Sequence, residues 1–170
     1  MSDFVIETRG LTKVYGEQTA VNSVNLHVRA GRIYGLLGRN GAGKTTIMKM
    51  ILGLAPITSG EVDVFGQNIK GREKQIYPRI GAIIENPGFY PNLTATENLR
   101  TFATLRGVPT PNALTDAFYL VRLPYKPNKP FSYYYLRTKK QFALTTPVHH
   151  VPELPAVSAS TVDLSAIRLY

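Results

Sequence analysis

The stretch GRNGAGKTT, residues 38–46, decides the fold class of this chain. It matches the phosphate-binding pattern G-x-x-x-x-G-K-[ST], with Gly38, Gly43, Lys44 and Thr45 at the fixed positions. The apolar run Ile33–Leu37 precedes it and is expected to form a buried strand. Apolar residues at helical spacing follow it, namely Ile47, Met50, Ile51 and Leu54. Because strand, glycine loop and helix occur in the required order, an unrelated glycine-rich turn is the less favoured interpretation.

The residue types of this stretch, here called the phosphate loop, suit a nucleoside triphosphate. Gly41 and Gly43 allow the main chain to curl with several N–H groups pointing inward. A helix that begins near Lys44 adds the positive end of its dipole. Lys44 is expected to reach the terminal phosphates, and the Thr45 hydroxyl is expected to contact Mg²⁺. The predicted nucleotide-binding residues of the loop are Gly38, Arg39, Asn40, Gly41, Ala42, Gly43, Lys44, Thr45 and Thr46.

Composition narrows the class of protein further. The chain has 170 residues, is 44% hydrophobic and contains no cysteine, so disulfide and thiolate chemistry are excluded. The start MSDFVIETRG lacks the features of a signal peptide, and no run of apolar residues is long enough to span a bilayer. A cytoplasmic location is therefore expected. The net charge of the chain is +9, and the excess of basic over acidic residues is larger in the second half, where Asp116 is the only acid between Glu97 and Glu153.

Nucleic-acid binding is not expected despite this charge. The basic and aromatic stretch Lys126–Lys140 could be interpreted as a single-strand binding platform. No fold signature of a nucleic-acid-binding domain accompanies it, and a solvated segment explains it better. The adjacent His149 and His150 are interpreted as surface histidines, because two neighbouring side chains rarely bind one metal ion without further ligands.

The first part of the chain has the pattern of a layered α/β domain. Thr94 and Glu97 form a capping-box pattern that predicts a helix through about Leu105, with Gly107 as its end. A second helix is expected from Thr110–Pro111 to about Val121. Further strands are predicted at Phe4–Glu7, Ala20–Val28, Glu61–Phe65 and Ile80–Ile84.

The pattern changes after Gly107, because all 14 glycines lie at or before it. We expect an ATP-binding domain at residues 1–123 and a degenerate remainder of the same domain at residues 124–170. No strand is expected in PVHHVPELPAVSAS, residues 147–160, because Pro152 and Pro155 interrupt it.

Three further motifs carry a family likeness. LTKVYG (residues 11–16), ITSGEVDVFG (57–66) and IGAIIENPGFYPNLTATENL (80–99), together with the phosphate loop, resemble the ATP-binding subunit of an ABC transporter. Within that family the chain is most similar to subunits of bacitracin and lantibiotic exporters, and the likeness extends from about Phe4 to Leu123. It implies an α/β P-loop NTPase-type nucleotide-binding domain: an ABC ATPase core, an antiparallel β subdomain and part of a helical subdomain, C-terminally incomplete.

The resemblance assigns roles to particular residues. It implies that Tyr15 stacks on the adenine of ATP and that Val21 flanks the base. It implies that Glu85 binds Mg²⁺ with Thr45 and senses the γ-phosphate, where most of the family has glutamine. Without the motifs, Tyr15 is a surface tyrosine and Glu85 an acid at the end of a strand. Residues 86–99 correspond to the groove that receives the membrane subunit, although their apolar side chains also suit local core.

The second half departs from the family pattern. The signature motif corresponds to Phe131–Gln141, in which Ser132 remains but Arg137 stands where a glycine is expected. Ser158 and Ala159 occupy the positions of the aspartate that holds Mg²⁺ and the glutamate that polarises water. Asp163 does not replace them, so the sequence identifies no catalytic residue.

These observations leave the enzymatic activity open. The resemblance implies a subunit that couples ATP binding and hydrolysis to the export of peptide antibiotics, as a homodimer on a membrane-spanning permease at the inner face of the membrane. The alternative is an ATP-binding module that does not hydrolyse ATP, or a truncated, non-functional relative. A corrupted reading frame after about Leu123 is a third interpretation.

Overall fold

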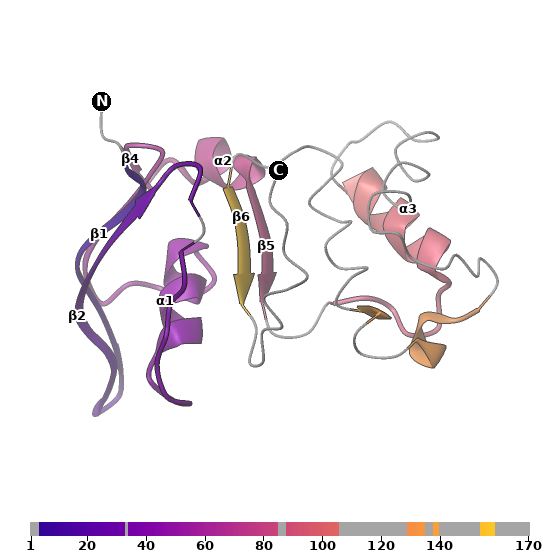
Figure 1. Cartoon of the computed structure of the whole chain (residues 1–170), viewed down its shortest axis with the longest axis horizontal. Helices are drawn as coiled ribbons and strands as arrows, with labels where there is room; N and C mark the ends of the chain where they lie inside the picture. The colour runs from indigo at the N-terminus through magenta and orange to yellow at the C-terminus, as the bar shows by residue number, and fades with distance from the viewer. Residues whose placement is uncertain are drawn as a thin grey trace. The chain divides into compact units, whose positions relative to one another are not determined.

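The computed structural model describes residues 4–32, 34–84, 88–105, 129–134, 138–139 and 154–158. The chain divides into two compact units, Met1–Arg79 and Ile80–Tyr170, and Figure 1 labels most of their helices and strands. The first unit contains the phosphate loop. The predicted division at residue 123 lies outside the described residues and stays a prediction.

A four-stranded antiparallel sheet, in the order β2-β1-β3-β4, makes up most of the first unit. β1 (Phe4–Tyr15) and β2 (Gln18–Arg29) form a long hairpin, visible at the indigo end of the chain in Figure 1. β3 (Ser59–Val64) pairs with β1, and the short β4 (Gln67–Asn68) pairs with β3. The three strands predicted in this region are confirmed, although β1 continues as far as Tyr15. α2 (Glu73–Ile76) and the 3-10 helix η1 (Tyr77–Arg79) complete the unit.

The core of this unit lies against one face of the sheet. Its polar member Thr8 is fully buried at an irregularity in β1, where its hydroxyl donates to Val24 O at 2.9 Å and accepts from Leu26 N at 2.9 Å. Both hydrogen bonds of the hydroxyl satisfy the buried group and tie β1 to β2. The buried apolar residues of the sheet are Ile6, Leu11, Val21, Val28, Val62 and Val64.

The helix after the phosphate loop is α1 (Lys44–Ile51), as the motif predicts. Its apolar face buries Ile47, Met50 and Ile51. Leu54, which the spacing also placed in the helix, lies beyond its end and is 67% exposed. Gly53 explains the difference: it has a φ of 69° and ends the helix, with Leu54 N donating to Lys49 O at 2.7 Å.

The described part of the apolar run before the phosphate loop, residues 34–37, is not a strand. Ile33 lies outside the described residues, whereas Tyr34–Leu37 have no regular secondary structure and Leu37 is 91% exposed. The prediction of a buried strand is therefore wrong for residues 34–37. An apolar run becomes a strand only where a neighbouring strand pairs its backbone groups, and the described sheet of this unit does not include it.

The second unit contains a parallel strand pair, β5 (Ile80–Ile84) and β6 (Leu154–Ser158). β5 has the predicted bounds. β6 corrects the expectation that prolines exclude a strand between residues 147 and 160, because Pro155 lies within it opposite Gly81. Among the described strands β6 pairs with β5 alone, and a strand with one paired side tolerates a proline whose nitrogen faces the other side.

The helix predicted after Thr94 is α3 (Ala95–Leu105). Its capping box is present: the Glu97 carboxylate accepts from Thr94 N at 2.7 Å and from the Thr94 hydroxyl at 2.7 Å, and Glu97 N donates to Thr94 Oγ1 at 3.3 Å. Gly107 and the helix predicted at residues 110–121 lie outside the described residues.

The capping box makes the stability of α3 depend on pH. Hydrogen bonds from the Thr94 backbone and hydroxyl lower the pKa of Glu97 from its ordinary value of 4.5, and Arg100 adds to this. A carboxylate with a lowered pKa contributes stability that is complete above its unfolded pKa and is lost as the pH falls through its folded pKa. We expect wild type to have a higher thermal midpoint than Glu97→Gln near neutral pH, and expect the difference to close in acid. A difference that is constant with pH would contradict this assignment.

Candidate nucleotide-binding site

The phosphate loop reaches from the end of the irregular segment to the first turn of α1. Ala42 N donates to Arg39 O at 3.1 Å, which closes a turn, and Ile47 N donates to Gly43 O at 2.9 Å, which begins the helix. Gly43 is the residue before α1 and has a φ of 82° in the left-handed region. The loop therefore leads directly into a helix N-terminus, whose N–H groups and dipole favour an anion.

The Lys44 ammonium folds back onto the loop. Its Nζ donates to Gly38 O at 2.6 Å and to Arg39 O at 2.7 Å. The two acceptors lie on the residues that open the loop, so the positive charge is held across the curved main chain. If a phosphate binds here, the Lys44 ammonium would exchange its bonds to these two carbonyl oxygens for charge-assisted hydrogen bonds to the phosphate.

The phosphate loop packs directly on β2. A Cβ at Gly43 would overlap the carbonyl oxygen of Ala20 and would lie 3.0 Å from Val21 Cγ2. Val21 itself is 4% exposed. The structure thus brings Val21 and Gly43 together, and only a glycine permits this close approach.

The remaining residues of the loop are accessible. Asn40 and Gly41 are exposed, and Thr45 and Thr46 are partly exposed in the first turn of α1. The Thr45 hydroxyl is a suitable oxygen ligand for Mg²⁺, an ion that usually keeps several waters and takes few protein ligands beside the phosphates. Glu85, the other predicted Mg²⁺ ligand, directly follows β5 and lies outside the described residues.

Charge in this part of the chain favours an anion. No acidic residue occurs between Glu17 and Glu61, whereas five basic residues do. No acid lies in the first turn of α1. The basic residues are Arg29, Arg32, Arg39, Lys44 and Lys49.

Tyr15 lies at the end of β1 and is 50% exposed. The described contact of its ring is with the Lys13 ammonium, 4.7 Å from the ring centroid. Lys13 is paired with Val21 in the sheet register. Sequence reasoning did not single out Lys13, although its spacing of two residues from Tyr15 on a strand places both on one face.

A second polar arrangement that the sequence did not reveal lies in the other unit. Asn98 is fully buried on α3; its Oδ1 accepts from Tyr90 N at 2.8 Å, and its Nδ2 donates to Tyr90 O at 3.0 Å and to Thr94 O at 3.1 Å. The sequence feature that could have revealed Asn98 is its place as a polar residue on the apolar face of α3, where the other buried residues are Ala95, Leu99 and Ala103.

The first residues of the signature region pack against residues 90–94, the segment to which the Asn98 side chain is hydrogen-bonded. The 3-10 helix η2 (Phe131–Tyr133) is joined to it by Phe131 N donating to Leu93 O at 2.8 Å and Ser132 N donating to Pro91 O at 2.9 Å. Phe131 is buried against Ala95 and Leu99. Ser132 is exposed, and Arg137 lies outside the described residues. Residues 88–99 thus form local core in part, one of the two roles left open for residues 86–99.

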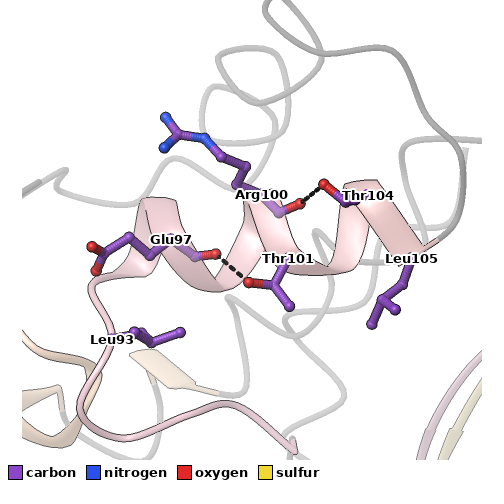
Figure 2. Close-up of a pocket in the computed structure, with 6 residues that line it drawn as sticks. All are labelled: Leu93, Glu97, Arg100, Thr101, Thr104 and Leu105. Atoms are coloured by element: carbon purple, nitrogen blue, oxygen red, sulfur yellow. Dashed lines mark hydrogen bonds between the residues drawn. The ribbon is translucent and has the colours of Figure 1, made fainter.

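An open pocket of about 460 Å³ lies along α3 (Figure 2). Figure 2 shows Leu93, Thr101 and Leu105 on one side of the helix and Arg100 extending from the other. The pocket shares no residue with the phosphate loop, so it is not part of the candidate site. Its lining residues are Leu93, Glu97, Arg100, Thr101, Thr104 and Leu105.

Two features are absent from the described residues. Within them, no helix combines the length and the apolar character that crossing a bilayer requires. The same residues contain no group of three or more His, Asp or Glu side chains placed to hold a metal ion.

Similarity to known proteins agrees with this geometry. A family model described as ABC transporter matches residues 21–151. The chain is 47% identical over 173 residues to the bacitracin transport ATP-binding protein BcrA of Enterococcus faecalis, a match that covers 99% of this chain and 56% of that protein. It is 34% identical over 167 residues to the lantibiotic transport ATP-binding protein SrtF of Streptococcus pyogenes, covering 97% of this chain and 70% of that protein.

A solved structure supports the fold. A dimeric ATP-binding cassette in a post-hydrolysis state, bound to ADP and Pi, matches with a TM-score of 0.78 and 20% sequence identity over 89% of this chain and 72% of that chain. The chain spans about half the length of its bacitracin-type relatives. The family resemblance and the α/β ABC ATPase fold expected from the sequence are confirmed. The chain belongs to the ABC transporter family, in the group that includes the bacitracin and lantibiotic transport ATP-binding proteins.

Proposed function

We propose that this chain binds ATP with Mg²⁺ at the phosphate loop. The observation that carries the proposal is the Lys44 ammonium held against Gly38 O and Arg39 O at the N-terminus of α1, with Gly43 packed on Val21. Gly38–Thr46 bind the phosphates, Tyr15 stacks on adenine and Val21 flanks the base. Thr45 and Glu85 are the proposed Mg²⁺ ligands. Bound Mg²⁺ would neutralise charge on the phosphates.

The chemical groups of the phosphate loop suit this ligand. Backbone N–H groups at the start of α1 have no acceptor within the helix, so they are available to phosphate oxygens. Lys44 supplies a cation beside them, and no acid between Glu17 and Glu61 opposes it. These features select for a polyanion, and the base-binding residues select for the purine.

In the cell, we propose that two copies of the protein act with a membrane-spanning permease to export peptide antibiotics, at the cytoplasmic face of the membrane. Relatives named as bacitracin and lantibiotic transport ATP-binding proteins support the substrate class. A dimeric relative bound to ADP and Pi supports the homodimer. ATP binding and hydrolysis would shift the population between open and closed dimers.

An ATP-binding module without hydrolysis is the second candidate. β6 places Ser158 at the end of a strand parallel to β5, where the family resemblance expects the aspartate that holds Mg²⁺. The strand is therefore present without the acid. Phosphate release above the background of a Lys44→Ala variant would favour the transport ATPase, and tight ATP binding without release would favour the module.

Lys44→Ala tests the binding site itself. We expect it to weaken MgATP affinity by about tenfold or more, because it removes charge-assisted hydrogen bonds to the phosphates. Isothermal titration calorimetry of both proteins measures the effect. Lys70→Ala, which changes an exposed lysine of the same unit, is the matched control and should bind as wild type does. Equal affinity of wild type and Lys44→Ala would overturn the assignment.

A further inference from the structure

A buried lysine lies beside the proposed base-binding residue. Lys13 on β1 is only 6% exposed, and its Nζ donates to Pro56 O at 2.7 Å. Burying an ammonium group costs free energy unless partners replace its water. An aliphatic residue fills a buried position on β1 more simply, as Leu11 does two residues earlier, so the buried charge of Lys13 requires an explanation.

Its second partner is the ring of Tyr15. The Lys13 ammonium lies 4.7 Å from the ring centroid, within the range of a cation–π contact. The two residues are separated by one position on β1, so their side chains lie on the same face of the strand. Half of the Tyr15 side chain stays exposed. The ammonium thus fixes the ring and leaves part of it accessible.

Lys13 also connects Tyr15 to the elements that form the phosphate loop. Its cross-strand partner is Val21, which packs against Gly43 at the start of α1. Its acceptor Pro56 belongs to the segment that follows α1. The Lys13 side chain therefore anchors the ring to the chain that leaves α1, and the main chain of Lys13 is paired with β2.

We propose that Lys13 is a positioning residue that holds the Tyr15 ring as a preformed platform for the adenine base, an inference that rests on the nucleotide site proposed above. A ring fixed before binding loses less side-chain freedom when the base stacks on it, so the anchor increases affinity for the base. It leaves affinity for the phosphates unchanged, because Lys44 and the loop bind them. Lys13 thereby contributes to the selection of a nucleotide over inorganic polyphosphate.

The experiment compares MgATP with magnesium tripolyphosphate as competitors for a fluorescent ATP analogue. In Lys13→Met, which keeps the length of the side chain and removes its charge, we expect the preference for ATP over tripolyphosphate to fall about fivefold, the size of one cation–π contact. Tripolyphosphate affinity should stay at the wild-type value, which shows that the loop is folded. Lys13→Arg keeps a cation and should retain most of the preference. Lys70→Met is the matched exposed control.

A double-mutant cycle separates positioning from a general effect on stability. In a Tyr15→Ala background, Lys13→Met should cause no further loss of preference, because the platform is already absent. An unchanged preference in Lys13→Met, or an equal loss in the Tyr15→Ala background, would overturn the inference. If wild type bound neither competitor, the proposed nucleotide site itself would fail, so the two failures are distinguishable.

Discussion

Replacing Gly43 with alanine is expected to lower the free energy of unfolding by about 3 kcal/mol and to abolish measurable ATP binding. Two costs combine at this position. The φ of 82° places the residue in the left-handed region, which an alanine adopts at a penalty. A Cβ would also overlap Ala20 O and crowd Val21 Cγ2 at 3.0 Å. Since the overlap involves backbone of the sheet, relief requires α1 or the loop to move.

Gly41→Ala is the matched control for this prediction. Gly41 has almost the same φ, 83°, yet a Cβ there would meet nothing within 4 Å. Its alanine variant therefore carries the conformational cost alone, about 1 kcal/mol. Urea denaturation followed by circular dichroism, together with ATP titration, measures both variants. Equal destabilisation by the two alanines would show that the close approach of Gly43 to β2 contributes nothing.

The elements that the sequence predicted correctly are those whose signals are local. The capping box at Thr94 and Glu97 sets the start of α3 by contacts within one turn. Gly66 lies in the turn that follows β3, and the phosphate-loop motif fixes the start of α1 at Lys44. In each case the residues that decide the structure are adjacent in the chain, so a pattern contains them.

The elements that the sequence predicted wrongly depend on partners far along the chain. Residues 34–37 are as apolar as β5, but β5 has a parallel neighbour in β6, whereas residues 34–37 are in no described strand. β6 forms despite Pro155 because its pairing with β5 compensates for the low strand propensity of proline. Strand formation is decided by the neighbour, and nothing in an isolated run of residues specifies that neighbour.

The candidate site divides in the same way. The motif specified Lys44 and Gly43, and the structure adds why they need their neighbours: Lys44 is held by Gly38 O and Arg39 O, and Gly43 lies on Val21. Lys13 could not be recognised from sequence, because its burial and its bond to Pro56 O arise only when the hairpin meets the segment after α1. A motif names the groups that touch a ligand, and tertiary packing determines which residues hold them.

Replacing Asn98 with alanine is the other change from which we expect a large effect, a loss of about 3 kcal/mol in the free energy of unfolding of the second unit. Asn98 is fully buried, and its side chain is the partner of both backbone groups of Tyr90 and of Thr94 O. Alanine cannot replace these hydrogen bonds. The part-buried Tyr90 N–H would lose its described partner, and such an unpaired group costs more than the bond itself contributes. Tyr90 O would keep the hydrogen bond from Leu93 N at 3.3 Å.

The loss of stability in Asn98→Ala should extend from residues 90–94 to η2. Residues 90–94 are held by Asn98 on α3, and they also accept hydrogen bonds from Phe131 N and Ser132 N of η2. Hydrogen exchange resolved by residue should therefore accelerate at Tyr90 in Asn98→Ala, and at Phe131 and Ser132 as well. Thr101→Ala, which removes a hydroxyl bonded to Glu97 O at 2.9 Å on the same helix, should change stability by less than about 0.5 kcal/mol. Unaltered exchange at Tyr90 in Asn98→Ala would mean that Asn98 does not hold this segment. Faster exchange at Tyr90 alone would mean that η2 is held by other contacts, chiefly the burial of Phe131 against Leu99.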